Sequence, residues 1–355
     1  MQVGLEAVTY SATNARIRGL RSRLLSVGTW RSLKHAERPT DVIDILLETT
    51  YRPQVEDYQL DNSLELVETR LSGRSAQLVR QLVTISNGAV RNLLTVWWQQ
   101  YELENLKNIF RGVQQRMAPE VTKRLMVPLG EYTTLPWDSL MQEQSVSSLI
   151  ERLERTHYIN PLRNATAAFQ REQSLFPLEI ALDIRYYRDV ASAIRHLQGA
   201  DQQEAERIFG TRLDILNILW AFRHRVYYGM SAEEIVNYTM WHTFRTDTDL
   251  VRDIALGADP RTIIRRIWSS AVDLSLLEGV NDPIQQMPAL GLTLDRYWWG
   301  LASREMSGYP FKLGAVLGYV VLSDLEIRDL VTVMEAKGMG WTQEQLSSNL
   351  IRIEG

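Results

Sequence analysis

The chain has no cysteine among its 355 residues. Disulfide bonds, thiolate metal sites and a cysteine nucleophile are therefore excluded, and the absence fits a reducing cytoplasm. Long hydrophobic runs are also lacking. The most apolar stretch, Leu313 to Leu322, is ten residues long, whereas a helix needs about 20 apolar residues to cross a bilayer. The N-terminus shows no signal-peptide pattern, so we expect no direct membrane insertion.

An excess of basic charge is missing as well. The chain carries 39 basic and 43 acidic residues, for a net charge of −4, so we expect no nucleic-acid partner. No phosphate-binding G-x-x-x-x-G-K-[ST] segment occurs, and the five histidines show no metal-ligand spacing. The sequence therefore predicts no catalytic residue, no cofactor and no metal site. A pair of catalytic carboxylates is not identified by any spacing among the acids.

What the chain does contain is helical periodicity. In residues 90–113, apolar side chains recur at intervals of three and four, which predicts one long amphipathic helix. Residues 178–197 and 262–277 show the same pattern. No sustained alternation of apolar and polar residues appears, so strands should be rare. The expected class is all-α.

One pattern recurs at a fixed interval. YELENLKNIF begins at residue 101, LDILNILWAF at 213 and LEIRDLVTVM at 325, each 112 residues after the last. A second pattern shares this interval, because LDIRYY at 182–187 returns as LDRYWW at 294–299. Two patterns with the same offset indicate an internal repeat rather than chance among helices.

Units of about 112 residues are long for solenoid repeats, so we interpret each as a small helical domain. The predicted domains are residues 1–113, residues 114–225, and residues 226–355 with a C-terminal tail. Three similar domains suggest a pseudo-threefold arrangement.

Each copy of the first pattern carries an acid followed three residues later by a second polar residue. The pairs are Glu102 with Asn105, Asp214 with Asn217, and Glu326 with Asp329. A spacing of three places both members on one helix face beside apolar residues, where they need hydrogen-bond partners. Two interpretations stay open. The pairs tie one helix to the next within each domain, or they line a shared cavity and contact a central partner.

Two other features also have two interpretations. The pairs Trp97-Trp98 and Trp298-Trp299 suit core packing, although paired tryptophans also occur in aromatic binding walls and membrane-interface belts. The basic run RIRGLRSRLL, with Arg16, Arg18, Arg21 and Arg23, is either a solvated helix face or a contact for acidic partners.

The repeats, taken in order, resemble the C subunit of bacterial and archaeal V/A-type ATP synthases, which is similar to the d subunit of the eukaryotic vacuolar proton pump. The resemblance covers essentially the whole chain. It rests on YSATNARIRGLRSRLL, DVIDILLETTY, YELENLKNIFRG, LDIRYY, LDRYWW and LGYVVLSDLEIRDLVTVMEAKGMG. The third copy departs from the pattern, because Asp329 replaces the expected amide and Glu335 stands where Arg111 and Arg223 stand in the other copies.

The resemblance implies a non-catalytic central-rotor subunit that is all-helical, funnel-shaped and built from three similar domains. One end would sit on the cytoplasmic face of the proteolipid ring, and the hollow would receive the central stalk. Rotation would thereby pass between ring and stalk during ion translocation and ATP synthesis or hydrolysis. The implied partners are the proteolipid ring, the central stalk subunits and the membrane stator subunit, and the implied location is cytoplasmic and peripheral to the membrane.

Two other classes of function are kept as alternatives. One is a soluble all-helical scaffold or regulatory protein that binds other proteins without membrane association. The other is an enzyme of an unrecognised helical type. Co-purification with a proteolipid ring distinguishes the rotor interpretation from both.

Overall fold

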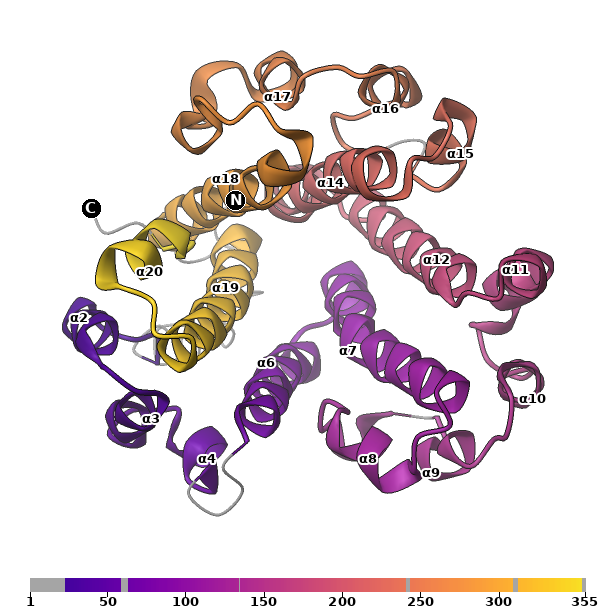
Figure 1. Ribbon diagram of the computed structural model, residues 1–355, viewed down its shortest axis with the longest axis horizontal. Helices are drawn as coiled ribbons and strands as arrows, with labels where there is room; N and C mark the ends of the chain where they lie inside the picture. Colours follow the sequence, from indigo (N-terminus) through magenta and orange to yellow (C-terminus); the bar gives the residue numbers. More distant parts are fainter. Residues whose placement is uncertain (1–22, 59–62, 134, 241–242, 309–311, 353–355) are drawn as a thin grey trace, which may run out of the picture. The chain divides into compact units, whose positions relative to one another are not determined.

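The computed structural model describes residues 23–58, 63–133, 135–240, 243–308 and 312–352 (Figure 1). All regular elements in these ranges are helices, which confirms the predicted all-α class. Arg16, Arg18 and Arg21 of the basic run lie outside the described residues.

The chain divides into two compact units. The first is Leu46–Val190 and is called the middle unit below. The second combines Met1–Ile45 with Ala191–Gly355 and is called the terminal unit. The predicted three-domain division is defined by sequence repeats and stays a prediction.

The middle unit is built around two long helices, α6 (Leu64–Ile85) and α7 (Gly88–Gln114), which pack against each other (Figure 1). A short helix precedes α6, and further short helices follow α7. The unit ends within α12 (Phe176–Arg195), which continues into the terminal unit. The shorter elements are α4 (Arg52–Val55), α8 (Pro119–Arg124), η1 (Gly130–Tyr132), α9 (Trp137–Met141), α10 (Val146–Arg152) and α11 (Ile159–Glu172).

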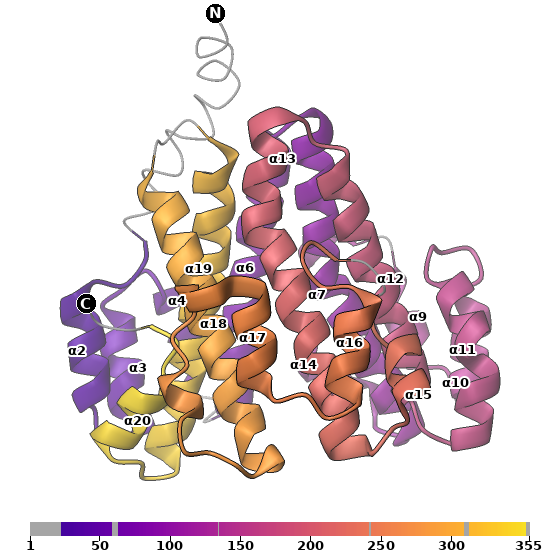
Figure 2. The same ribbon diagram turned by 90° about the horizontal axis from the view of Figure 1, so that it is seen from above.

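In the terminal unit, α18 (Pro283–Ser307) packs along α19 (Leu313–Gly338) and also contacts α14 (Thr211–Tyr228), as Figure 2 shows. A π-helical segment, η2 (Glu206–Gly210), joins α13 (Gly199–Ala205) to α14. The remaining elements are α2 (Val27–His35), α3 (Pro39–Leu47, whose last turn enters the middle unit), α15 (Ala232–Asn237), α16 (Thr248–Ala255), α17 (Pro260–Trp268), η3 (Ser269–Ala271), η4 (Ser275–Leu277) and α20 (Gln343–Asn349).

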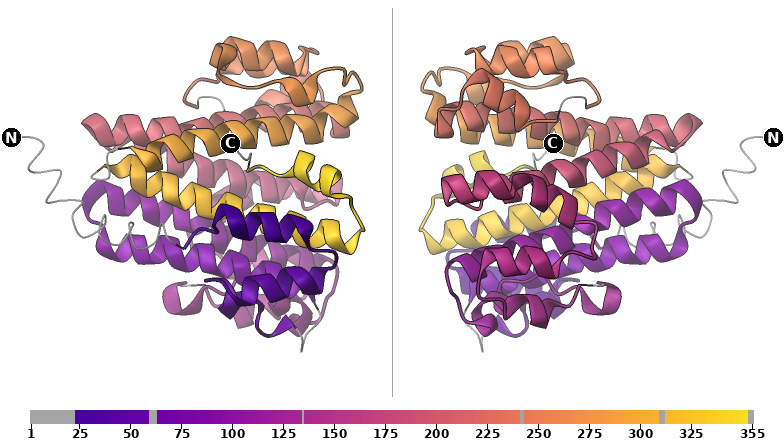
Figure 3. Two further views of the ribbon diagram at one scale, coloured as in Figure 1. Left: turned by 90° about the vertical axis from the view of Figure 1, so that its left-hand side faces the viewer. Right: turned by 90° about the vertical axis from the view of Figure 1, so that its right-hand side faces the viewer.

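The first and last described helices meet in the terminal unit. Helices α2 and α20 lie side by side, indigo and yellow in Figure 3. The Lys337 ammonium donates a hydrogen bond to the Lys34 carbonyl at 2.8 Å, and the Glu326 carboxylate accepts from the Leu25 amide at 3.0 Å. The N-terminal segment therefore packs on the third copy of the repeat.

Local sequence signals account for several helix limits. Ser231 with Glu234 and Thr342 with Gln345 form capping boxes at the starts of α15 and α20. The helix expected over 262–277 is wrong in its extent, because α17 ends at Trp268. Ser269 has a φ of 53°, a left-handed conformation that an α-helix does not tolerate.

Helix α7 is buried over more of its surface than the single apolar stripe of an amphipathic helix would predict. In α7 the buried set includes Glu102, Asn105 and Lys107 as well as the apolar residues. Trp97 and Trp98 are both buried, which confirms core packing for that pair. Trp298 is buried, whereas Trp299 is half-buried. A helix buried on most of its faces must satisfy its polar side chains within the protein.

Candidate functional site

The six predicted polar residues form a repeated set of contacts, called the polar anchors below. In the first copy, Glu102 is 5% exposed. Its carboxylate accepts hydrogen bonds from the Tyr158 hydroxyl at 2.9 Å and the Thr133 hydroxyl at 3.0 Å. The Asn105 side-chain nitrogen donates a hydrogen bond to the Val127 carbonyl at 2.8 Å, and the Asn105 side-chain oxygen accepts one from the Val127 amide at 2.6 Å. Both side chains thus hold segments that follow α7.

The second copy holds its following segment in the same manner. Asp214 is fully buried, and its carboxylate accepts from the backbone amides of Arg245 and Thr246 at 2.8 and 2.9 Å. The Thr243 hydroxyl donates to the same carboxylate. Asn217 again makes a two-way pair, donating to the Met240 carbonyl at 3.0 Å and accepting from the Met240 amide at 2.9 Å.

The third copy replaces the amide by a carboxylate, and its partners explain the change. Asp329 accepts from the Ile351 amide at 2.8 Å and from the Arg352 amide at 2.9 Å. A carboxylate only accepts, so it suits two N–H donors, whereas Asn offers one donor and one acceptor. Asp329 therefore matches its partners as well as Asn105 and Asn217 match theirs.

The partners of the anchors lie at nearly constant sequence distance. Asn105 and Val127 are 22 residues apart, Asn217 and Met240 are 23, and Asp329 and Ile351 are 22. The structure brings together the two members of each pair and the segment that follows, and it supplies an intramolecular partner for all six residues. The geometry favours tie points between each long helix and the segment that follows it, and for Asn105 and Asn217 that segment lies beyond the predicted domain boundaries at 113 and 225. A role in partner binding stays a prediction.

Burial changes the protonation behaviour of two anchors. Burial raises the pKa of Asp214 above its usual value, although the hydrogen bonds from Thr243, Arg245 and Thr246 oppose the rise. Burial also raises the pKa of Asp329, and the amides of Ile351 and Arg352 oppose it. The donors around each carboxylate thus offset part of the cost of burying the charged form.

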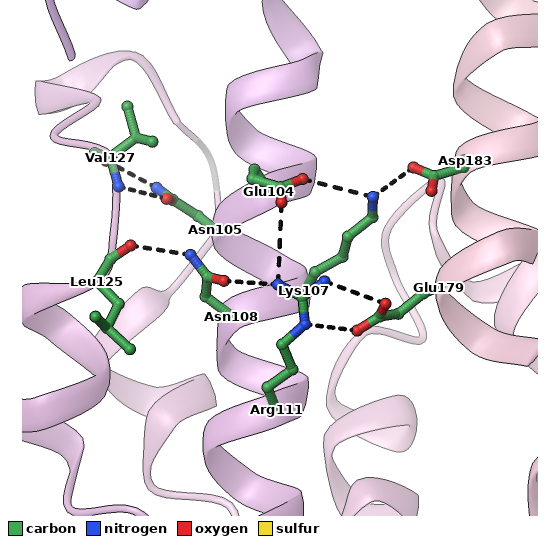
Figure 4. Close-up of polar contacts among 9 residues, drawn as sticks. All are labelled: Glu104, Asn105, Lys107, Asn108, Arg111, Leu125, Val127, Glu179 and Asp183. Carbon is green, nitrogen blue, oxygen red and sulfur yellow. Dashed lines mark hydrogen bonds and ion pairs between the residues drawn. The ribbon is translucent and has the colours of Figure 1, made fainter. Parts of the chain in front are cut away.

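A polar cluster beside the first anchor was not predicted from the sequence (Figure 4). The Lys107 ammonium lies 2.5 Å from the Asp183 carboxylate, and the Arg111 guanidinium binds Glu179 at 2.8 and 3.1 Å. Glu104 approaches both cations, at 3.5 Å from Lys107 and 4.0 Å from Arg111. These pairs connect α7 to the part of α12 that belongs to the middle unit.

Lys107 is only 8% exposed. Burial alone would lower the pKa of Lys107, but the carboxylates of Asp183 and Glu104 raise it above its usual value. The ammonium therefore stays charged and satisfied by its acidic neighbours. The sequence signal that points to this cluster is the recurrence of Asp183 as Asp295.

Asp295 occupies the corresponding position in the terminal unit. Its carboxylate lies 2.9 Å from Arg212 on α14 and 2.6 Å from Arg328 on α19. Burial would raise the pKa of Asp295, but the two guanidiniums outweigh it and hold the pKa below its usual value. One buried carboxylate on α18 thereby joins three long helices.

The recurring aromatic residues make equivalent contacts too. The Tyr186 hydroxyl donates to the Trp97 carbonyl at 3.2 Å, and the Trp298 indole N–H donates to the Ile208 carbonyl at 2.8 Å. Ile208 follows Trp97 by 111 residues, whereas the anchors keep an interval of 112. The second copy thus has one more residue than the first between this contact and the anchor. The π-helical segment η2 lies at this point, and a π-helical turn accommodates one inserted residue without ending the helix.

The described residues include no group of three or more histidine or acidic side chains placed to hold a metal ion. None of the helices in the described part of the chain combines the length and the apolar character that a membrane crossing requires.

Comparison with known proteins decides the family. Residues 13–348 match the family described as ATP synthase (C/AC39) subunit. The chain belongs to this family. The membership agrees with the resemblance noted in the sequence and with its prediction of a non-catalytic subunit of a rotary complex.

Curated relatives support the same family. Three of them are the C subunits of the A-type ATP synthases from Methanocaldococcus jannaschii, Archaeoglobus fulgidus and Halobacterium salinarum, with identities of 21%, 23% and 22%. The alignments cover 98%, 95% and 97% of this chain and 88%, 94% and 98% of the relatives. The similarity to these proteins thus extends over almost the full length on both sides.

Proposed function

We propose that this chain is a central-rotor subunit of a V/A-type ATP synthase or ATPase. In this role it sits on the proteolipid ring and couples the ring's rotation to the central stalk during ion translocation and ATP synthesis or hydrolysis. Membership of the ATP synthase (C/AC39) subunit family supports the assignment to a rotary complex.

The observation that carries the coupling role is the repetition of the polar anchors. Each of α7, α14 and α19 holds its following segment through buried hydrogen bonds at nearly the same sequence distance. A part that transmits torque must resist deformation, and close-packed helical cores with fixed connections transmit strain. Chemistry is not required of such a part.

We further propose three similar domains, residues 1–113, 114–225 and 226–355, arranged with approximate threefold symmetry as a funnel whose hollow receives the stalk. The equivalent anchors in the three copies support this arrangement. The proposed partners are the proteolipid ring, the central stalk subunits and the membrane stator subunit. The proposed location is the cytoplasmic surface of the membrane, without insertion.

Reconstitution of the complex with and without this chain tests the proposal. We expect complexes that lack the chain to retain ATP hydrolysis in the head but to lose ATP-driven ion transport, and re-addition should restore transport. The full chain should also co-purify with the ring in detergent extracts. Transport that is unaffected by removal, together with failure to co-purify, would favour a soluble scaffold.

A separate assay tests the non-catalytic role. The purified chain alone should show no ATP hydrolysis above background. Turnover in a clean preparation, abolished by a point substitution in this chain, would contradict the assignment.

A further inference from the structure

Large apolar side chains are exposed where three long helices of the terminal unit end. Ile284 in the first turn of α18 is 57% exposed, Met339 directly after α19 is 70% exposed, and Tyr227 in the last turn of α14 is 49% exposed. The three residues are called the apolar end below. Isolated exposed apolar residues are common on proteins, so the relative positions of these three decide whether they form a surface.

Helices α18 and α19 bring two of the residues together. The helices follow each other in the chain and pack side by side, so they run in opposite directions (Figure 2). Asp295 on α18 binds Arg328 on α19 at 2.6 Å. Ile284 lies eleven residues before Asp295, and Met339 lies eleven residues after Arg328. Because all α-helices share one rise per residue, Ile284 and Met339 lie level with each other.

Helix α14 brings Tyr227 to the same end of the unit. Arg207 in η2 binds Glu305 at 2.8 Å, and Arg212 in α14 binds Asp295 at 2.9 Å. Residue numbers thus rise along α14 while they fall along α18, so the C-terminal end of α14 lies beside the N-terminal end of α18. Tyr227 follows Arg212 by fifteen residues, which places it about one turn beyond the level of the other two residues. The apolar end is therefore one surface over three neighbouring helix ends.

The repeat shows that these apolar side chains are not needed for the fold. Met339 lies 112 residues after Tyr227, and the position 112 residues before Tyr227 is Gln115. Gln115 directly follows α7 and is exposed, so a polar side chain serves at the equivalent place in the first copy. Exposed apolar residues that gather on one surface mark a site of contact with another molecule.

The residues around the apolar end are mostly acidic. Four exposed carboxylates come from the segment before α18, the last turn of α19 and the first turn of α20, and they are Glu278, Asp282, Glu335 and Glu344. None of these four forms an ion pair within the part of the chain that the structure describes. The exposed Arg223 lies one turn before Tyr227 on α14. An anionic lipid surface attracts basic segments, so this acidic rim suits a protein partner with basic side chains instead.

We propose that the apolar end docks against another subunit of the rotary complex, on a surface that carries apolar and basic side chains. The apolar residues of this chain would be removed from water, and the carboxylates would face the partner's cations at the rim of the contact. The inference rests on the proposed function, because it takes the partner from the complex to which this chain is assigned.

Single cysteines test the contact, because the chain has no cysteine of its own. The rate of maleimide labelling of Ile284→Cys and Met339→Cys is measured in the free full chain and in the assembled complex. We expect labelling in the complex to be at least about tenfold slower, because groups at the centre of an interface are shielded from water.

Ser270→Cys is the matched control at an exposed position of η3 in the same unit. Trp268, two residues earlier, contacts Tyr297, which lies thirteen residues along α18 from Ile284. The labelling rate of Ser270→Cys should change by less than about twofold on assembly. Equal slowing at all three positions would show general shielding by the complex and contradict the site.

Other outcomes separate this inference from the proposed function. Labelling of Ile284→Cys and Met339→Cys at the free rate, in a complex that retains the chain, contradicts the docking surface alone. Failure of the wild-type chain to join the complex contradicts both. Slower labelling of the free chain after addition of phosphatidylglycerol vesicles would assign the surface to a membrane. Slower labelling at a higher concentration of the free chain would assign it to a second copy.

Charge reversal tests the acidic rim. Glu335→Lys should raise about tenfold the concentration of chain that restores transport to complexes lacking it, because like charges across an interface repel. Asp249→Lys reverses a charge on α16, where the side chain is 79% exposed, and should change that concentration by less than about twofold. Added salt should reduce the effect of Glu335→Lys by screening. Equal effects of the two reversals would contradict a local acidic contact.

Discussion

Asn105 and Val127 form a closed pair, in which the side-chain amide gives one hydrogen bond to the Val127 carbonyl and takes one from the Val127 N–H. The side chain thus replaces a backbone partner for a segment that has left helical structure. Asn217 and Met240 repeat the arrangement. This use of an amide explains why a polar residue recurs among the buried and mostly apolar positions of these helices.

Replacement of Asn105 by Leu should therefore destabilise the protein. Two backbone groups of Val127 would lose their partners, at a cost of about 1–3 kcal/mol for each buried group. We expect Asn105→Leu and Asn217→Leu each to lower the free energy of unfolding by roughly 2–4 kcal/mol in chemical denaturation. Asn92→Leu, at an exposed position on α7, is the control and should have little effect.

The same variants separate the two interpretations of the polar anchors. Loss of stability in Asn217→Leu with normal stalk binding by the folded fraction supports tie points between each long helix and the segment that follows it. An unchanged melting temperature with lost stalk binding would support anchors that line the hollow and contact the partner.

The third copy gives a test of donor and acceptor matching. Asp329→Asn restores the residue type of the other copies but points an N–H₂ group toward one of two backbone N–H donors. We expect a loss of about 1–3 kcal/mol in the free energy of unfolding, because one amide loses its acceptor. The exposed Asp249→Asn, which changes the same charge in the terminal unit, should change stability by less than about 0.5 kcal/mol. A variant as stable as the wild type would show that the residue is exchangeable.

The sequence identified the repeats and the positions of the polar anchors, because both follow from local spacing. Their partners could not be predicted, since Val127, Met240 and Ile351 lie in irregular segments without a pattern of their own. The pairing of Lys107 with Asp183 depends on two helices that are far apart in sequence. The packing of the N-terminal segment on the third copy has no local signal either, because the Leu25 amide that Glu326 binds is a backbone group present at every position.

Asp183 and Asp295 occupy equivalent positions in the repeat, but their charges should contribute differently to the free energy of unfolding. Asp295 is shared by two guanidiniums that lower its pKa, whereas burial raises the pKa of Asp183 above its usual value and Lys107 only partly offsets it. The side chains of Arg212 and Arg328 are themselves 19% and 48% exposed, so solvent screening reduces the free energy lost when Asp295 is replaced. We expect Asp295→Asn to cost about 2–3 kcal/mol, and more than Asp183→Asn. Equal costs in urea denaturation would contradict the difference.

His224 should make stability depend on pH in a defined window. The side chain is 1% exposed, and burial lowers its pKa from 6.5 to about 4. Between these values the unfolded chain binds a proton that the folded chain does not, so stability falls as pH decreases from 6.5 to 4 and is fully present above 6.5. The pKa shift makes the free energy of unfolding about 3 kcal/mol lower below pH 4 than above pH 6.5.

Urea denaturation at several pH values measures this dependence. His224→Gln removes the titrating group, so the decline between pH 6.5 and pH 4 should become shallower by an amount approaching that difference, whatever the variant's stability at pH 7. The exposed His196→Gln serves as the control and should keep the wild-type slope. A decline that persists in His224→Gln between these pH values would come from His157, because burial lowers the pKa of that imidazole as well. Carboxylates with lowered pKa, such as Asp295, lose their contribution only as pH falls below about 4. A slope unchanged by His224→Gln over the whole window would mean that the pKa of this imidazole is the same in the folded and unfolded states, which would contradict the prediction.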